Sequence, residues 1–125
     1  MLSRLGKQCG VKRLFSCCPS GSQAIYEVSI GFHDSSIREE YYNWLSGRHV
    51  REVLNVDGFL SAEILNEYKG NGLVVRYTIE STDVFERYNA SEQAVRLRQE
   101  ALGKFGPKSF SATRRVLIVS DMIYK

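Results

Sequence analysis

The larger part of this 125-residue chain contains no cysteine, and its amino-terminal segment contains no acidic residue. All three cysteines, Cys9, Cys17 and Cys18, precede Gln23, and the first acidic residue is Glu27. Without thiols, the part of the chain that follows can form neither a disulfide framework nor a cysteine nucleophile. The chain therefore has two regions of different chemistry.

Several signatures of known functions are also missing. The sequence has no Gly-rich phosphate loop, no Ser/His/Asp grouping and no pair of metal-binding motifs. Its two histidines, His33 and His49, lack the third ligand that a metal site needs. We therefore predict neither a cofactor nor a bound metal ion. No apolar run approaches the length of a membrane-spanning helix, so we also predict no membrane span.

The basic character of the chain, a net charge of +3, belongs to its amino-terminal segment. That segment contains Arg4, Lys7, Lys12 and Arg13. Without these four, 13 of the 17 basic residues remain against 14 acidic ones, a net charge of −1. Domains that bind nucleic acids usually carry a strongly basic surface. The near-neutral remainder therefore predicts no nucleic-acid partner.

Residues 1–23 have the composition of a mitochondrial transit peptide. They are basic, contain serine and lack acidic residues, and the segment from Arg13 to Ser16 is similar to the cleavage sites of mitochondrial presequences. We therefore predict a leader and linker over residues 1–23, a domain over residues 24–125, and a location in the mitochondrial matrix or facing it. The alternative is a basic amino terminus that carries no targeting signal.

Four segments in which apolar and polar residues alternate predict β-strands. In the first, apolar Tyr26 and Val28 flank the acidic Glu27. A Gly-Asn-Gly sequence at residues 70–72 predicts a tight hairpin between the second and third strands. The four predicted strands are residues 24–32, 59–68, 73–80 and 110–119.

Two regions between these strands have the spacing of amphipathic helices. The first extends through Trp44, and Gly47 is predicted to interrupt it before a second, shorter helix. The second region is predicted in two pieces, residues 84–88 and residues 92–105, and the Gly106-Pro107 pair ends it.

The predicted order of elements is strand, helix, strand, strand, helix, strand. Right-handed crossovers place both helical regions on one face of a four-stranded antiparallel sheet. The sequence therefore predicts an α+β domain with the ferredoxin-like fold, whose other sheet face is open.

The residues around His49 resemble a known family. Trp44-Leu45, followed by the segment from Arg48 to Leu54, resembles the Trp-x₃₋₅-His-x-Pro-Glu-Val-Leu stretch of a small, largely bacterial family of unknown function. In that family, proline is common at the position of Arg51. The resemblance spans about residues 25–119, and further similar groups are Glu86-Arg87-Tyr88, Arg96-Leu97-Arg98, and Phe105-Gly106 with Lys108.

This family resembles part of the dimeric α/β-barrel superfamily, which includes cofactor-independent monooxygenases, small isomerases and haem-binding proteins. The resemblance implies a homodimer in which the open faces of two sheets meet. It does not imply a reaction, because that superfamily supports many chemistries.

The open sheet face is predicted to carry mostly polar residues. Glu63 and Arg76 are predicted to pair there, because an unpaired buried charge is strongly unfavourable. The pair is either a structural ion pair or, in the other interpretation, part of a ligand-binding pocket between two sheets. The polar residues on this face are Glu27, Ser29, Ser61, Glu63, Arg76, Thr78 and Glu80.

His49 is the residue most suited to catalysis, because histidine side chains titrate near neutral pH and this one lies near a predicted helix end. Glu52, three residues later, is the predicted carboxylate that orients His49 as a general base. Trp44 is a candidate ligand contact. The alternatives are a packing or capping role for His49 and a core position for Trp44.

These observations leave two hypotheses of function. In the first, the domain is a non-catalytic interaction module, an accessory subunit of a larger mitochondrial protein assembly. In the second, it is a cofactor-independent enzyme or small-ligand-binding protein that uses His49 and a cavity between the two sheets of a dimer. A cavity above about 300 Å³ beside His49 favours the second hypothesis.

Overall fold

The computed structural model describes residues 22–125, so the predicted leader and the three cysteines lie outside the described residues, apart from the end of the linker. No helix within residues 22–125 combines the length and the apolar character needed to cross a bilayer. In chain order the elements are β1 (Ala24–Phe32), α1 (Arg38–Trp44), α2 (Val50–Leu54), β2 (Phe59–Asn66), β3 (Leu73–Ile79), α3 (Thr82–Asn89), α4 (Glu92–Phe105) and β4 (Phe110–Ile118).

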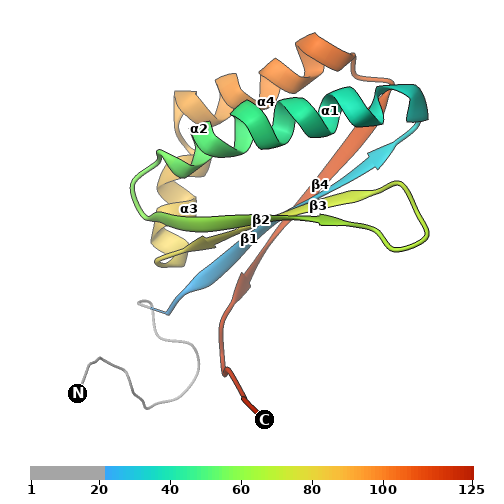
Figure 1. Ribbon diagram of the computed structural model, residues 1–125. Helices are drawn as coiled ribbons and strands as arrows, with labels where there is room; N and C mark the ends of the chain where they lie inside the picture. The colour runs from blue at the N-terminus through green and yellow to red at the C-terminus, as the bar shows by residue number, and fades with distance from the viewer. Residues whose placement is uncertain (1–21) are drawn as a thin grey trace.

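The four strands form one antiparallel sheet in the order β2-β3-β1-β4. The helices cover one side of this sheet and leave the other side open (Figure 1). Both helical crossovers return the chain to the same sheet, which places the helices on a common face. The predicted ferredoxin-like fold is confirmed.

The core lies between the sheet and the helices. Tyr26 and Ile30 of β1 and Val75 and Tyr77 of β3 are buried there, and they belong to one apolar cluster with Leu97 of α4. These strand residues occupy alternate positions, as the sequence pattern predicts. Each large apolar side chain buried in this way stabilises the fold by about 1.5–3 kcal/mol.

Gly47 does not interrupt the first helical region, contrary to the prediction. The chain continues from α1 through a π-helical turn, Leu45–His49, directly into α2. A π-helical turn holds one more residue than an α-helical turn, and such turns occur often at functional sites. His49 is the last residue of this turn.

The turn before β2 requires glycine at position 58. Gly58 has a φ of +91°, and a Cβ atom there would clash with the side chain of Val84 in α3. The backbone N–H of Glu80 donates a hydrogen bond of 2.9 Å to the carbonyl of Gly58, which ties the turn to the end of β3. The turn therefore lies against α3 with no room for a side chain.

We predict that Gly58→Ala lowers the free energy of unfolding by about 2–4 kcal/mol, because it adds backbone strain and a clash with Val84. Chemical denaturation followed by circular dichroism measures this change. Gly103→Ala in α4 is the matched control, since a Cβ atom there meets nothing within 4 Å and alanine favours a helix. A Gly58→Ala variant as stable as the wild type would contradict the close approach of the turn to α3.

Candidate functional site

A cavity of about 510 Å³ lies between the sheet and the helices of a single chain. Strands β1, β3 and β4 line one side of it, and α4 together with the π-helical turn lines the other. Pockets that bind small molecules have volumes of about 300–1,000 Å³. The cavity is therefore large enough for a small organic ligand.

Four tyrosines bring hydroxyl groups to the cavity wall: Tyr26, Tyr41, Tyr77 and Tyr88. The rings of Tyr26 and Tyr77, from neighbouring strands, are stacked with their centroids 5.6 Å apart. Burial raises the pKa of Tyr41 to about 12 and the pKa of Tyr88 to about 12, and it also raises the pKa of Tyr77. These three hydroxyl groups are therefore protonated at neutral pH and act as hydrogen-bonding groups rather than as bases.

Two arginines, Arg98 and Arg114, place positive charge at the cavity. Arg98 extends from α4, and its Nη2 donates a hydrogen bond of 3.3 Å to the hydroxyl of Tyr26. Its guanidinium group also lies over the ring of Tyr88, 5.8 Å from the centroid. Nε of Arg98 is buried and has no hydrogen-bond partner among residues 22–125. Because leaving a buried donor unpaired is costly, this N–H is suited to donate to a ligand oxygen.

The π-helical turn brings His49 to the same cavity. Its ring stacks on Trp44, with the centroids 4.6 Å apart, and its Nδ1 atom is buried without a partner in the described part of the chain. Burial lowers the pKa of His49 to about 4, although the nearby Glu52 carboxylate raises it and Arg114 lowers it further. The imidazole is therefore neutral at pH 7, with one nitrogen that donates and one that accepts.

Nδ1 of His49 does not contact the carboxylate of Glu52, its predicted catalytic partner. The carboxylate of Glu52 lies 3.4 Å from Nε of Arg48, and Nδ1 of His49 has no hydrogen-bond partner in the part of the chain that the structure describes. Trp44 supports the His49 ring from behind and is not part of the cavity wall. His49 lines the cavity on the helix side of its own sheet, and its use in a cavity between two sheets stays a prediction.

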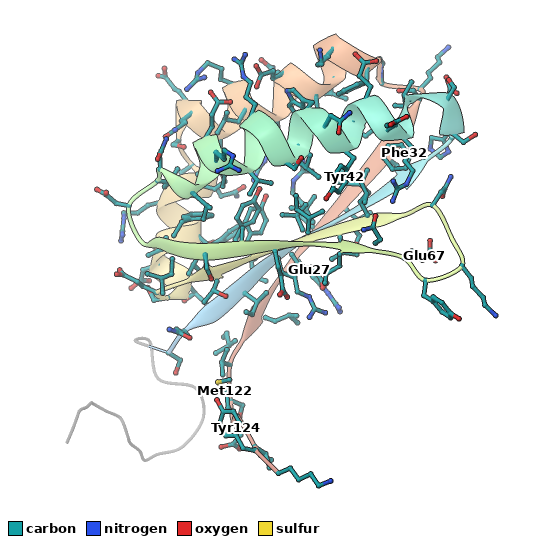
Figure 2. All side chains as sticks on the ribbon, viewed as in Figure 1. Glu27, Phe32, Tyr42, Glu67, Met122 and Tyr124 are labelled. Atoms are coloured by element: carbon teal, nitrogen blue, oxygen red, sulfur yellow. The ribbon has the colours of Figure 1, made fainter. Side chains whose placement is uncertain are left out.

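The ion pair predicted between Glu63 and Arg76 on the open face is not formed. Glu63 and Arg76 are opposite each other on β2 and β3, but Nε of Arg76 lies 3.0 Å from Oε2 of Glu27. Nε of Arg115 lies 2.6 Å from the other carboxylate oxygen of Glu27. Figure 2 shows Glu27 on the side of the sheet away from the helices, and only 4% of this residue is exposed. The hydrogen bonds from Arg115 and then Arg76 hold the pKa of Glu27 below its usual value.

Sequence reasoning identified His49 but not most of the groups around it. Alternation along the last strand places Arg114 between Ala112 and Val116, and therefore on the helix-facing side, where an arginine is unusual. That position was a usable signal. Arg98 gave no such signal, because a helical arginine beside the buried Leu97 is usually solvated.

The groups around the cavity define what can bind there. The aromatic rings favour a planar ligand, and the two guanidinium groups favour an anion or a polarised oxygen. The neutral ring of His49 can accept a hydrogen bond from a ligand hydroxyl or donate one to a carbonyl. No cluster of three or more His, Cys, Asp or Glu side chains suited to a metal ion occurs within residues 22–125.

The chain matches the model of one known protein family. The model of a domain of unknown function, DUF4286, matches residues 23–119, which contain every strand and helix of the fold. The chain belongs to this family. No curated protein matches the sequence of this DUF4286 domain at a significant level.

Several crystallised proteins share the fold of the DUF4286 domain. A monooxygenase from the gene ActVA-Orf6 of Streptomyces coelicolor, in complex with nanaomycin D, is 17% identical with a TM-score of 0.64, over 83% of this chain and 93% of that one. SnoaB, a cofactor-independent oxygenase from Streptomyces nogalater, is 13% identical with a TM-score of 0.62, over 83% and 99% of the two chains. A dimeric ferredoxin-like protein from an uncultured marine organism is 12% identical with a TM-score of 0.59, over 82% and 99%. At these identities the likeness shows the fold.

The low pKa of His49 predicts that acid destabilises the DUF4286 domain. Between about pH 4 and the unfolded-state pKa of 6.5, the unfolded chain binds a proton at this residue that the folded chain does not, so stability falls as pH falls. The loss attributable to His49 should be about 2 kcal/mol between pH 7 and pH 5. Chemical denaturation at a series of pH values measures it.

His49→Phe keeps an aromatic ring against Trp44 and removes the titrating group. Its stability should depend less on pH than that of the wild type between pH 7 and pH 5. The contribution of Glu27 does not interfere, because a lowered carboxylate pKa acts only below about pH 4.5. Identical pH dependence in the two proteins would contradict the burial of His49 in its neutral form.

Proposed function

We propose that this protein binds a planar, oxygen-bearing small molecule in the cavity between its sheet and its helices. The observation that carries the proposal is that His49 and Arg98, which both line one cavity of about 510 Å³, each hold a buried polar atom, Nδ1 and Nε, without a hydrogen-bond partner among residues 22–125. Buried polar groups in folded proteins nearly always have partners. Two such atoms, on residues that line the same cavity, favour a ligand that supplies those partners when it binds.

The two unpartnered atoms and their neighbours specify the class of ligand. Nε of Arg98 can only donate, so it requires an oxygen that accepts. The neutral imidazole of His49 pairs with a hydroxyl or a carbonyl group. Arg114 adds a second positive charge on the same wall. A hydroxylated aromatic ketone or quinone, in its neutral or anionic form, carries all of these features on one flat framework.

Two proteins with this fold support the proposal. One is an oxygenase described as cofactor-independent, and the other is a monooxygenase in complex with nanaomycin D. An oxygenase without a cofactor must draw electrons from its own substrate, and an electron-rich aromatic anion supplies them most readily. The two guanidinium groups at this cavity favour such an anion. Oxygen uptake in the presence of the ligand would extend the function from binding to catalysis.

The proposal corresponds to the second of the two hypotheses from the sequence, with the cavity inside each chain and not between two sheets. The first hypothesis, an accessory subunit of a larger assembly, requires no interior cavity. The polar groups that line this one therefore favour a small-molecule partner over a protein assembly.

The proposed function includes a homodimer in which the open faces of two sheets meet. Leu65 and Leu117 lie on that face and are 37% and 38% exposed in the single chain. Burying such side chains against a second copy is favourable. A protein with the same fold is described as dimeric, and closing two four-stranded sheets gives eight strands, enough for a filled barrel.

We predict that Arg98→Met weakens the binding of lawsone, a planar hydroxynaphthoquinone, by about tenfold or more. The variant keeps an unbranched apolar stem, though a shorter side chain, and removes the charged donors; a hydrogen bond to a charged group contributes about 1.5–3 kcal/mol. Isothermal titration calorimetry on the wild type and the variant measures the difference.

Arg96→Met is the matched control for this experiment. Arg96 lies on the same helix but is exposed and does not line the cavity, so its removal should leave lawsone affinity nearly unchanged. Equal loss of affinity in both variants, or no binding of lawsone to the wild type, would contradict the proposed site. Circular dichroism confirms that each variant is folded.

The proposed function also places the protein in mitochondria, on the basis of the composition of residues 1–23. The full chain with a fluorescent protein at its carboxyl terminus should accumulate in the mitochondria of cultured cells. Changing Arg4, Lys7, Lys12 and Arg13 to Gln should leave the fusion in the cytosol. The same distribution for both fusions would show that these residues are not a mitochondrial targeting signal.

A further inference from the structure

One row of four charged residues crosses the open face of the sheet from edge to edge. Glu63 on β2 is opposite Arg76 on β3, which in turn is opposite Glu27 on β1. Arg115 on β4 lies on the other side of Glu27. The charges therefore alternate across the sheet: negative, positive, negative, positive. Because neighbouring strands are about 4.8 Å apart, the row is about 14 Å long.

The ends of this charge row are not satisfied within one chain. Glu27, in the middle, accepts hydrogen bonds from Arg76 at 3.0 Å and from Arg115 at 2.6 Å. The side chains of these two arginines are still 43% and 65% exposed. Glu63 has no ion-pair partner among residues 22–125. A negative charge at one edge and a largely exposed positive charge at the other are thus available to a second molecule.

A second copy of the charge row complements the first in one orientation. If two sheets face each other across a two-fold axis that runs parallel to the strands, between β3 and β1, the order of the second row is reversed. Glu63 then faces the partner's Arg115, and Arg76 faces the partner's Glu27. Every charge in the row meets a charge of opposite sign.

A two-fold axis perpendicular to the strands gives the opposite result. The second row then keeps the order of the first, so that Glu63 faces its own copy and Arg115 faces its own copy. Like charges opposed in an interface are strongly unfavourable. The charge row therefore distinguishes between the two ways in which the sheets can face each other.

Apolar residues on both sides of the charge row strengthen its preference for one of the two sheet orientations. Ile25 and Leu117 are opposite each other on one side of the row, and Leu65 and Val74 are opposite each other on the other side. A second sheet that covers these residues also removes water from the charges between them. Charge–charge interactions are stronger, in either sign, in such a partly desolvated setting.

We propose that the charge row sets the orientation of the homodimer, with the two-fold axis parallel to the strands and an ion pair between Glu63 and the partner's Arg115 at each edge. The inference rests on the homodimer of the proposed function and adds the axis direction and the contacting residues. Ion pairs of this kind contribute more to specificity than to affinity. The partner it commits to is a second copy of this chain.

Because residues 22–125 contain no cysteine, cross-linking can test the orientation directly. In the full chain, with Cys9, Cys17 and Cys18 changed to Ser, the double variant Glu63→Cys/Arg115→Cys should form a covalent dimer with a short bis-maleimide. The two positions lie at opposite edges of one sheet, so the link can form only between chains. Each single variant should remain a monomer on a denaturing gel.

Reversal of one charge gives a second readout that needs no cross-linker. Glu63→Arg opposes two pairs of like charges in the proposed dimer, and it should weaken dimerisation by about tenfold or more in sedimentation equilibrium at low salt. Glu86→Arg makes the same change of charge on an exposed position of α3 and should leave dimerisation unchanged. High salt should narrow the difference between the two variants.

The outcomes separate this inference from the proposed homodimer. A wild-type chain that sediments as a monomer overturns the homodimer. A wild-type dimer in which Glu63→Cys alone cross-links efficiently overturns the axis direction while the homodimer stands. A Glu63→Arg variant that dimerises as tightly as the Glu86→Arg variant also overturns the axis direction.

Discussion

The contacts of Tyr26 connect the sheet, the helices and the cavity. Its ring stacks on Tyr77 of β3 and packs against Phe85 and Tyr88 of α3, with centroids 5.1 and 6.2 Å away. Its hydroxyl accepts a hydrogen bond from Arg98 of α4. One side chain on a central strand therefore links a neighbouring strand to two helices. Each aromatic pair of this kind contributes about 0.5–1.5 kcal/mol beyond the burial of its area.

The tyrosines packed around Tyr26 also contribute polar groups to the interior. Four tyrosines line the cavity between the sheet and the helices, together with Leu97 and Arg98 of α4. The guanidinium of Arg98 donates to the hydroxyl of Tyr26, while its own Nε has no partner within residues 22–125. Natural proteins depart from an apolar, fully paired core chiefly at functional sites. The π-helical turn that presents His49 is a second departure from regular structure at the same cavity.

The fold was predictable because it depends on periodicity. The alternation around Glu27 correctly assigns each residue of β1 to one face of the sheet, and the Gly-rich hairpin correctly joins β2 to β3. Periodicity does not say which of two carboxylates an arginine reaches, so it could not distinguish Glu27 from Glu63 as the partner of Arg76. It also did not predict the π-helical turn that ends at His49, because a helical repeat of 3.6 residues does not describe such a turn.

We propose that Arg98 and His49 hold an oxygen-bearing ligand inside the chain. The most direct test is ¹⁵N NMR of their side chains during titration with lawsone. We expect the Nδ1 resonance of His49 to shift and the Nε–H of Arg98 to become protected from solvent exchange as the cavity fills. Unchanged side-chain signals, with shifts confined to surface residues far from the cavity, would contradict it.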